Sequence, residues 1–528
     1  MKVVSFEQAV SIIEDGDTVL IGGSGGGHAV PEALIVALED RFLDTGSPND
    51  IILLHPVGLG DMESQGVDHL AYPDLLKRIV TGALVNTPTI QKMAQRDTVE
   101  AYTLPQGVLS QLMNAMAAGR PGLISHVGLH TFVDPRRGGG SQSPSAREKL
   151  VEVIELAERE WLFYKPYHVD VAFLRGTTAD EDGNVTMEHE AVFGEMLAMA
   201  QATHNAGGVV IVQVERVAKR GTRPPKDVKI PGMLVDWVVV DPDQMQTYTT
   251  AYSPSYAGEL RVPLDEIAPL PFDARKVIAR RAAMELFPGA ICNLGAGIST
   301  GIANVAAEEG FLDEIVLTNE QGLIGGAPAS GVDAGAAMNY DAIIDQPYQF
   351  SFYDGGGLDL AFLSFAQVDA EGSVNVSRFG SKIIGIGGFQ NIAQNAKKVI
   401  FSGTFTASGL DIDWVEGKTA IHQEGRYPKF VAQLEQVSYN GVYAAELDQE
   451  VLFVTERAVF RRDPEGLTLI EIAPGLDVEA DVLAQMAFRP QVSDDLKTMD
   501  ARLFQSEPMG YRDALLQRPR RNMPRRLQ

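Results

Sequence analysis

An internal repeat constrains the fold of this chain more than any other feature of the sequence. Residues 170–174 return as residues 359–363, an offset of 189 residues, and each copy is followed by Asp, Gly and Val at the same spacing. Other segments are related by offsets of 190 and 272 residues, namely 205–211 with 395–401 and the glycine turns 23–25 with 295–297. Two related halves predict two domains that share one fold.

Short apolar runs alternate with amphipathic segments along both halves. The runs that have the composition of buried strands are residues 18–21, 51–54, 209–214, 234–240, 314–317, 398–402 and 451–454. Residues 31–42 and 274–286 lie between such runs and carry apolar side chains at helical spacing. This alternation is typical of parallel α/β sheets. We therefore predict an α/β protein made of two related domains with parallel or mixed sheets.

The boundary between the halves is expected near residue 270, where Pro269 and Pro271 interrupt the chain before a predicted helix. The predicted domains are residues 1–270 and 271–505, followed by a peripheral basic tail, residues 506–528. The two offsets, 272 and 189, differ by 83 residues, which the first half carries in excess. We assign this excess to the glycine-rich loop at residues 128–145.

Composition excludes several classes of protein. The chain has 528 residues, too many for one core, and a formal net charge of -26, which argues against a nucleic-acid surface. No apolar run has the length of roughly 18 residues that spans a bilayer, and the start lacks a signal-peptide core. We expect a soluble, cytoplasmic protein without membrane or nucleic-acid partners. The single cysteine, Cys292, lies in an apolar run and is expected to be an inert core thiol.

The acidic residue Glu320 stands where an apolar run gives way to a glycine-rich turn. Residues 314–317 have the pattern of a buried parallel strand, so Glu320 is expected where that strand leaves the sheet. Open α/β sheets build their sites at this edge. A carboxylate placed there can attack a carbonyl carbon. The alternative is a carboxylate that caps a helix or is simply solvated.

Two glycine turns in the second half offer backbone donors. The turn of Gly295, Ala296, Gly297, Ile298 and Ser299 joins a predicted strand to a predicted helix, a place where N–H groups can meet a phosphate. Thr300 stands where a dinucleotide fingerprint needs glycine, so no nicotinamide cofactor is expected. A tight turn that serves packing alone is the alternative. The second turn, at residues 385–389, contains Gly388 and has the geometry of an oxyanion hole.

Other residue patterns are less specific. Gln106 precedes a helical stretch, and its amide is either a helix cap or a ligand contact. The sequence lacks a zinc-binding His-Glu-x-x-His pair and a P-loop. His130 and His189 are expected to be surface or structural residues. We expect no metal ion.

Taken together, these segments resemble the family I coenzyme A transferases, and within them the single-chain short-chain acyl type that includes propionate and acetate CoA-transferases. The resemblance covers nearly the whole chain. It rests on residues 104–107, 320–328, 342–347, 352–357 and 374–380. It implies the two-domain fold of that family, a dimer or homotetramer, and coenzyme A as a substrate with no permanently bound cofactor.

The resemblance also implies roles for the candidate residues. Glu320 corresponds to the nucleophile, Gln106 to the side-chain donor of an oxyanion hole, and Gly388 to its backbone donor. The turn of residues 295–299 corresponds to a coenzyme-contacting turn. Related enzymes often carry Asn or Ala after the nucleophile, where this chain has Gln321. That departure bears on the choice of acyl group and not on the reaction.

The implied reaction exchanges CoA between an acyl-CoA and a free carboxylate by a ping-pong route through a glutamyl-CoA thioester. Two alternatives stay open at the level of sequence. An acyl-CoA hydrolase could use the same covalent glutamate and admit water, and a non-catalytic metabolite-binding protein could retain the fold. Loss of the nucleophile would mark the second alternative, and Glu320 is present.

Overall fold

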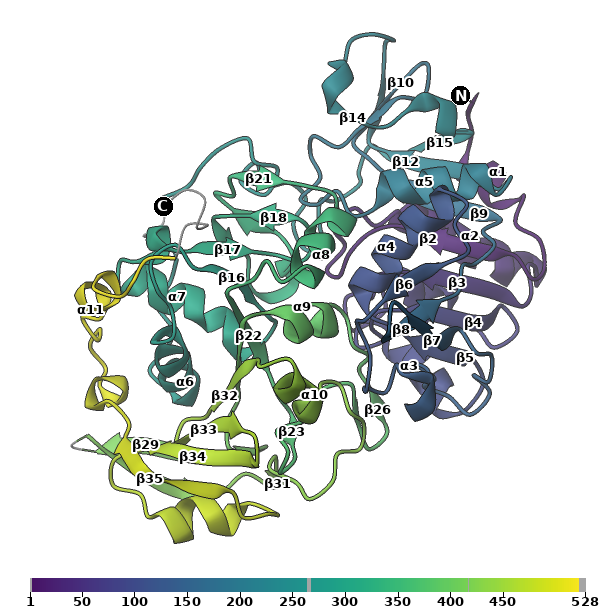
Figure 1. Cartoon of the computed structure of the whole chain (residues 1–528). Helices are drawn as coiled ribbons and strands as arrows, with labels where there is room; N and C mark the ends of the chain where they lie inside the picture. The colour runs from purple at the N-terminus through teal and green to yellow at the C-terminus, as the bar shows by residue number, and fades with distance from the viewer. Residues whose placement is uncertain (1, 264–266, 416, 522–528) are drawn as a thin grey trace.

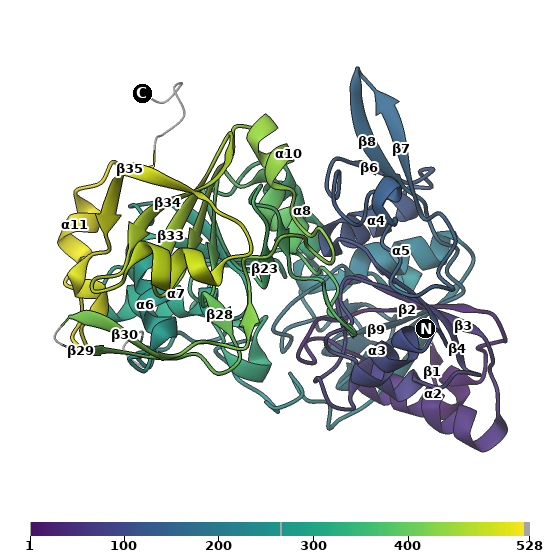
Figure 2. The same cartoon turned by 90° about the horizontal axis from the view of Figure 1, so that it is seen from below.

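The computed structural model describes residues 2–263, 267–415 and 417–521. It contains two large sheets, one in each half of the chain, with helices between them and outside them (Figure 1). Viewed from below, the two halves lie side by side and touch through helices and loops (Figure 2). None of the helices in the described ranges combines the length and the apolar character that crossing a bilayer requires.

The sheet of the first half has eight strands, and all of its neighbouring strands pair in parallel. Its order is β1 (Lys2–Val3), β15 (Trp237–Val240), β12 (Val209–Val214), β9 (Val171–Arg175), β2 (Thr18–Ile21), β3 (Ile51–His55), β4 (Leu76–Thr81) and β5 (Glu100–Thr103). Strands β2, β9 and β12 are almost wholly buried, as expected of parallel strands covered on both faces.

The sheet of the second half has ten strands and is mixed. Its order is β21 (Ala342–Ile343), β18 (Leu323–Ile324), β17 (Val316–Thr318), β16 (Ile291–Leu294), β22 (Leu360–Ser364), β27 (Lys398–Ser402), β32 (Glu450–Val454), β33 (Ala458–Asp463), β34 (Gly466–Ile472) and β35 (Gln491–Thr498). The parallel strands β17-β16-β22-β27-β32 repeat the order β3-β2-β9-β12-β15 of the first sheet. The repeat in the sequence is therefore a repeat of topology, and the predicted fold class is confirmed.

Helices cover both faces of each sheet, and the inner helices of the two halves meet. In the first half, α1 (Phe6–Val10), α2 (Glu32–Thr45) and α3 (Pro88–Gln95) cover one face, and α4 (Gln106–Ala117) and α5 (Met196–Asn205) cover the other. In the second half, α6 (Ala274–Ala283) and α7 (Gly301–Glu308) cover one face, and α8 (Gln346–Asp354) and α9 (Phe389–Asn395) the other. Helices α4 and α5 face α8 and α9 (Figure 1), so four helix ends converge between the halves.

The excess residues of the first half are not confined to the loop at 128–145, so that prediction from the sequence is wrong. They fall within two segments of the first half. One is residues 118–170, which include β6 (Leu123–Ser125), β7 (Val151–Leu156) and β8 (Arg159–Tyr164), and the other is residues 56–105, which include β4, α3 and β5. The predicted loop docks on the second half, because Gly128 N–H donates to Gln394 Oε1 (2.8 Å) and Phe132 N–H donates to the Val437 carbonyl (2.8 Å).

Both halves also contain smaller sheets outside the two large ones. The first half carries a four-stranded sheet of β13 (Arg216–Ala218), β10 (Thr178–Asp180), β11 (Val185–Thr186) and β14 (Val228–Ile230). The second half carries the pairs β19 (Ala327–Pro328) with β20 (Ala337–Met338), β23 (Gln367–Val368) with β24 (Val374–Asn375), β25 (Arg378–Phe379) with β26 (Lys382–Ile383), β28 (Thr406–Ala407) with β31 (Tyr427–Pro428), and β29 (Asp411–Val415) with β30 (Lys418–Gln423). Helix α10 (Gly441–Glu446) precedes β32, and its Ala444 belongs to the same buried core as Val451 and Phe453 of that strand.

The C-terminal segment packs against the outer helices of the second half. Beyond residue 505, Met509, Tyr511 and Leu515 join the buried core around α6 and α7, and α11 (Arg512–Leu516) lies there. Arg521 pairs with Asp359 (2.9 Å). Residues 522–528, the rest of the predicted basic tail, lie outside the described residues. The predicted domain boundary at residue 270 falls between β15 and α6, and we keep it as a proposal.

Candidate active site

Glu320 lies in the turn between β17 and β18, where the chain leaves the sheet and folds back on itself. Its carboxylate accepts a hydrogen bond from Asn293 Nδ2 (3.3 Å) and does not belong to a helix. Burial raises the pKa of the Glu320 carboxyl, and hydrogen bonds from its own backbone N–H and from Asn293 oppose that shift. The carboxylate is thus weakly solvated, which makes it a stronger nucleophile once it is ionised.

Asn293 connects Glu320 to the helix that faces the other half. It is fully buried on β16, and its Nδ2 also lies within hydrogen-bond distance of the Thr318 carbonyl (3.2 Å) and of Tyr353 Oη (3.3 Å). Tyr353 on α8 donates to Thr318 Oγ1 (2.9 Å). These contacts hold Glu320 against Tyr353 near the end of α8. Gln346, the first residue of that helix, lies about 10 Å along the helix axis from Tyr353.

Gln106 and the glycine turn before α9 lie directly against each other. The Gln106 backbone N–H donates to the Gly387 carbonyl (2.8 Å), and the N–H groups of Ile386 and Gly387 donate to the Gly82 carbonyl (both 2.8 Å). Gly385 has a φ of 89°, and a Cβ there would lie 2.6 Å from Ala83 Cα, so only glycine fits this approach between the halves.

The backbone N–H of Gly388 makes no hydrogen bond with any part of the chain that the structure describes. Gly388 is the N-cap of α9, where N–H groups of a helix start are unpaired. Gly388 directly follows Gly387, whose carbonyl accepts the hydrogen bond from the Gln106 backbone N–H. The structure therefore brings together the two residues that the sequence suggested as oxyanion donors.

The side chain of Gln106 is not a helix cap. Gln106 is the first residue of α4, and its Nε2 donates to Gln346 Oε1 (3.2 Å) in the second half. The side chain is 3% exposed, so an amide that faced no partner would be costly there. Nε2 carries a second hydrogen, and Oε1 is the side-chain atom of Gln106 that lies toward the glycine turn, 3.8 Å from where a Cβ on Gly387 would stand.

The turn of residues 295–299 follows β16, the strand that also carries Asn293. Gly297 has a φ of 95°, and Ser364 Oγ donates to the Ala296 carbonyl (3.0 Å). Ser299 Oγ is buried and has no hydrogen-bond partner among the described residues. The turn leads through a short 3-10 helix, residues 298–300, into α7. This donor-rich turn and Glu320 thus leave neighbouring strands, β16 and β17, at the same sheet edge.

The first half contributes a second glycine turn to the same region. Gln321 Nε2 donates to Ser24 Oγ (3.3 Å), and a Cβ on Gly26 would lie 2.1 Å from the Val332 carbonyl oxygen. Residues 22–27 therefore pack closely against the segment that carries the nucleophile candidate.

A small cavity lies beside the residues that precede Glu320. Its volume is about 20 Å³, and it is lined by Leu294, Leu317, Thr318, Asn319, Leu323, Gly325, Pro328 and Ala337. A water molecule needs at least about 10 to 15 Å³ by this measure, so the space suits one or two carbon atoms. Most of its walls are apolar.

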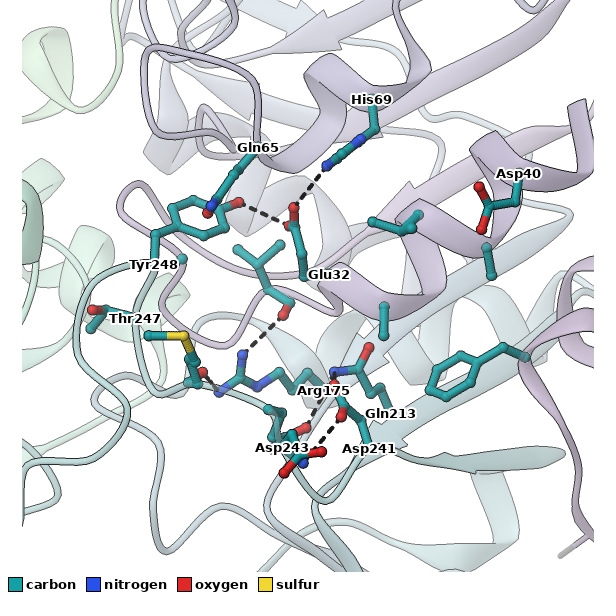
Figure 3. A pocket seen from close by; sticks show the side chains of 18 of the residues that line it. Glu32, Asp40, Gln65, His69, Arg175, Gln213, Asp241, Asp243, Thr247 and Tyr248 are labelled. Carbon is teal, nitrogen blue, oxygen red and sulfur yellow. Dashed lines mark hydrogen bonds and ion pairs between the residues drawn. The ribbon is translucent and has the colours of Figure 1, made fainter. Parts of the chain in front are cut away.

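A larger cavity, of about 720 Å³, lies in the first half and contains none of the candidate residues (Figure 3). Its buried polar groups already have partners. Arg175 donates to Glu190 (2.9 Å), and Glu32 accepts from Tyr248 Oη (3.2 Å) and contacts His69 (3.3 Å). Hydrogen bonds to Glu32 and Glu39 raise the pKa of His69 to about 9.

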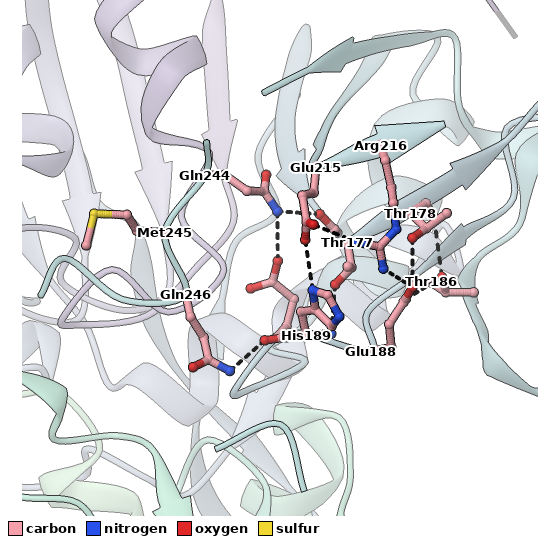
Figure 4. A network of polar contacts seen from close by, with 12 residues as sticks. Thr177, Thr178, Thr186, Glu188, His189, Glu215, Arg216, Gln244, Met245 and Gln246 are labelled. Carbon is pink, nitrogen blue, oxygen red and sulfur yellow. Dashed lines mark hydrogen bonds and ion pairs between the residues drawn. The ribbon is translucent and has the colours of Figure 1, made fainter. Parts of the chain in front are cut away.

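The histidines take structural positions, as the sequence predicted. His189 Nδ1 contacts Glu215 (2.8 Å) within a network of paired polar groups around β10 and β11 (Figure 4). His130 packs against Tyr443, with ring centroids 4.8 Å apart and the ring planes tilted by 52°. Cys292 is buried in β16, and burial raises the pKa of its thiol. Within the described ranges, no group of three or more His, Cys, Asp or Glu side chains is arranged to hold a metal ion.

Sequence reasoning missed Asn293, Tyr353, Gln346 and Glu195 as parts of this region. A signal existed for Asn293, which is the one amide in an otherwise apolar strand and therefore needs a partner when buried. Gln346 and Tyr353 lie in segments that carry the family resemblance. The contacts of Gln346 with Gln106 and with Glu195 had no signal in the sequence, because these residues lie 240 and 151 positions apart in the chain.

Comparison with known proteins relates the whole chain to one family. The family model for coenzyme A transferase matches residues 3–241. The acetate CoA-transferase YdiF of Escherichia coli (strain K12) is 44% identical over 512 residues, which cover 97% of this chain and 96% of that protein. The caffeate CoA-transferase of Acetobacterium woodii is 45% identical over 511 residues, which cover 95% of this chain and 97% of that protein.

A solved structure supports the same relationship. The crystal structure of the acyl-CoA transferase YdiF from E. coli O157:H7, a thioester complex with CoA, superposes with a TM-score of 0.92 at 43% identity. The match covers 96% of this chain and 97% of that one.

Proposed function

The chain belongs to the coenzyme A transferase family and is an enzyme of that type, and from this premise we propose that it moves CoA between short-chain acyl-CoA thioesters and short-chain carboxylates through a covalent intermediate on Glu320. The observation that carries this proposal is the Glu320 carboxylate itself. It is weakly solvated, held by Asn293 and set in the turn where β17 ends.

In the first stage, a Glu320 carboxylate oxygen attacks the thioester carbonyl carbon. The tetrahedral intermediate expels CoA as a thiolate and leaves a mixed anhydride between Glu320 and the acyl group. The thiolate then attacks the side-chain carbonyl carbon of Glu320, and the first carboxylic acid leaves as a carboxylate. The product is a glutamyl-CoA thioester.

In the second stage, the acceptor carboxylate reverses these steps. It attacks the glutamyl thioester, the CoA thiolate leaves, and the thiolate then attacks the acyl carbon of the new anhydride. Glu320 is released as a carboxylate. Every intermediate stays activated, so the exchange consumes no ATP, and CoA is a substrate and not a resident cofactor.

Each tetrahedral intermediate carries negative charge on one oxygen. We assign Gln106 Nε2 and the Gly388 N–H as the donors that meet this charge, because the Gln106 backbone bonds Gly387, the residue before Gly388, and the Gly388 N–H has no acceptor in the described chain. Loss of one such donor costs about 3 kcal/mol of barrier, or roughly a hundredfold in rate. We assign the turn of Gly295, Ala296, Gly297, Ile298 and Ser299 to contacts with CoA.

The small cavity supports a preference for short acyl groups. We place the end of the acyl chain in this cavity, whose volume of about 20 Å³ leaves room for the one or two carbon atoms beyond the carbonyl of an acetyl or propionyl group and not for an aromatic ring. Relatives of nearly equal identity are an acetate and a caffeate CoA-transferase, so identity alone does not select the acid. Steady-state rates with acetyl-CoA, propionyl-CoA and caffeoyl-CoA test this preference, and faster turnover of caffeoyl-CoA would reverse it. A homo-oligomer remains part of the proposal, to be measured by light scattering.

The decisive experiment traps the covalent intermediate. The protein is exposed to acetyl-CoA without an acceptor and then to borohydride, which reduces a glutamyl thioester to an alcohol and releases CoA. Intact mass and peptide mapping are expected to place the change on Glu320 with loss of activity. The matched control is Asp341→Asn, which removes an exposed carboxylate that follows the same hairpin and pairs only at the surface with Arg261.

The outcomes separate the candidate functions. Modification of another residue would show that the nucleophile is assigned wrongly. Free CoA that accumulates steadily from acetyl-CoA alone would show that water replaces the acceptor acid, as in a hydrolase. Absence of both transfer and hydrolysis would leave only a binding function.

A further inference from the structure

The contact between Gln106 and the glycine turn occurs twice in the molecule. Helix α4 begins at Gln106, and its backbone N–H donates to the Gly387 carbonyl (2.8 Å). Helix α8 begins at Gln346, and its backbone N–H donates to the Gly194 carbonyl (2.9 Å). Both glycines have positive φ, 52° and 56°. The repeat therefore places two similar sites face to face at the interface of the halves.

The two copies differ in the residue after the glycine. Gly387 is followed by Gly388, the N-cap of α9, and Gly194 is followed by Glu195, the N-cap of α5. Helices α5 and α9 end at Asn205 and Asn395, the asparagines that the repeat relates. One copy thus presents a bare backbone donor, and the other carries a carboxyl group at the same place.

The Glu195 carboxylate is bound by the same two kinds of donor that we assign to the oxyanion hole. Its Oε2 accepts from Gln346 Nε2 (2.7 Å), and its own backbone N–H also bonds the carboxyl group. Ser110 Oγ adds a third hydrogen bond (2.6 Å). The side chain is 1% exposed, and Oε1 has no partner among the described residues.

We propose that Glu195 is a positioning residue for the transfer reaction: its carboxylate fills the counterpart of the oxyanion site, fixes the amide of Gln346 and thereby aims the amide of Gln106 at the substrate. The proposal rests on the role of Gln106 in the proposed function. Glu195 does not touch the reacting atoms.

The reason lies in the direction of the hydrogen bonds. An ionised carboxylate only accepts, so it requires Gln346 to present its NH₂ group to Glu195. Gln346 Oε1 then faces Gln106, which must present its own NH₂ group in return (3.2 Å). The second Nε2 hydrogen of Gln106 is left for the substrate oxygen. An amide at position 195 could either donate or accept a hydrogen bond. It would therefore no longer fix which end of the Gln346 amide, and in turn of the Gln106 amide, carries the donor.

The first test is Glu195→Gln, which has nearly the same shape. Assays at pH 8 keep the wild-type carboxyl ionised, since burial raises its pKa only to about 7. The kcat is expected to fall about tenfold, part of the roughly hundredfold loss of a whole donor, while the KM for acyl-CoA changes less than twofold. The matched control is Glu190→Gln, another buried glutamate of the same loop, which contacts Arg175 and not Gln106. Its kcat is expected to stay within twofold of wild type.

The second test is a double-mutant cycle. In a Gln106→Ala background, Glu195→Gln is expected to leave kcat unchanged, because the group through which it acts is gone. Gln346→Met, which removes the intervening amide at similar volume, is expected to lower kcat about as much as Glu195→Gln and not to add to it. We call this chain of hydrogen bonds from Glu195 through Gln346 to Gln106 the relay. If the melting temperature shows that Glu195→Gln folds poorly, Gln346→Met still tests the relay.

The outcomes distinguish the relay from the proposed function. Equal losses from Glu195→Gln with and without Gln106 would overturn the relay alone. An unchanged kcat in Gln106→Ala would remove Gln106 from the oxyanion hole. A wild-type protein that transfers no CoA would refute the proposed function itself.

Discussion

The two halves share one sheet topology, yet only the second carries a nucleophile candidate. Strand pairing relates the positions. Thr318 pairs with Asn293, which pairs with Ala361, whereas Leu54 pairs with Leu20, which pairs with Ala172. Ala172 and Ala361 are the related residues of the repeat. These pairs make Thr318 of the second half equivalent to Leu54 of the first half. Glu320, two residues after Thr318, is therefore equivalent to Pro56, two residues after Leu54.

The halves diverge in the course of the chain after the equivalent strands β17 and β3. After β17 the chain turns back as the antiparallel strand β18, which keeps Glu320 in a tight turn at the sheet edge. After β3 it continues to the parallel strands β4 and β5 and so reaches α4 and Gln106. In the proposed site, one half supplies the carboxylate and the other half supplies the amide. Duplication followed by divergence accounts for this proposed division of roles between the halves.

The largest expected effect concerns the residue that distinguishes the halves. Glu320→Asp is expected to lose at least about a hundredfold in kcat, close to the loss in Glu320→Ala, because it withdraws the carboxylate by one bond from its attack position. Retention of more than about a tenth of wild-type turnover would argue against covalent catalysis by this side chain. Adding Pro56→Glu to Glu320→Ala is expected to restore nothing, since Glu195 occupies the counterpart of the oxyanion site.

The next effect concerns the contribution of the first half. Gln106→Ala is expected to lower kcat by roughly one to three orders of magnitude with a smaller change in the KM for acyl-CoA, since an oxyanion donor acts mainly on the transition state. A structural role alone would lower the melting temperature and leave kcat unaltered. Kinetics and thermal unfolding of the same preparation separate these results.

Much of this arrangement was predictable from the sequence. The repeat, the parallel order and the position of Glu320 at the end of a strand follow from periodicity and offsets. Strands 18–21, 209–214 and 398–402 have the predicted bounds. The expected strand at 234–240 begins only at Trp237, because residues 232–234 form a 3-10 turn. The relation between Gln106, Gln346 and Glu195 was not predictable, since each side chain has several rotamers and only packing between the halves selects one.

A smaller effect is expected from Asn293→Leu, which installs the residue that the first half has at this position, Leu20. Loss of the hydrogen bond from Asn293 raises the pKa of Glu320 further, so ionised Glu320 forms only at higher pH. The acid limb of kcat/KM is expected to shift to higher pH, with a loss of about tenfold near neutrality. An unshifted acid limb would mean that Asn293 does not tune the nucleophile.

The smallest effect concerns the polar contacts that join the inner helices. Asp354 at the end of α8 accepts hydrogen bonds from Gln111 Nε2 on α4 (2.8 Å) and from Asn391 Nδ2 on α9 (2.9 Å). Burial raises the pKa of Asp354 to about 7. The same residue thus links the two halves and titrates near neutral pH.

Because this folded pKa lies above the unfolded value of about 4, the folded state holds more protons between these limits, and its stability falls as pH rises from about 4 to about 7. Asp354→Asn removes this dependence and keeps one acceptor. We expect the free energy of unfolding of wild type relative to Asp354→Asn to fall by about 2 to 3 kcal/mol between pH 5 and pH 8, measured by urea denaturation at both pH values. A difference that does not vary with pH would show that Asp354 stays ionised between the halves, and that the interface tolerates a buried charge there.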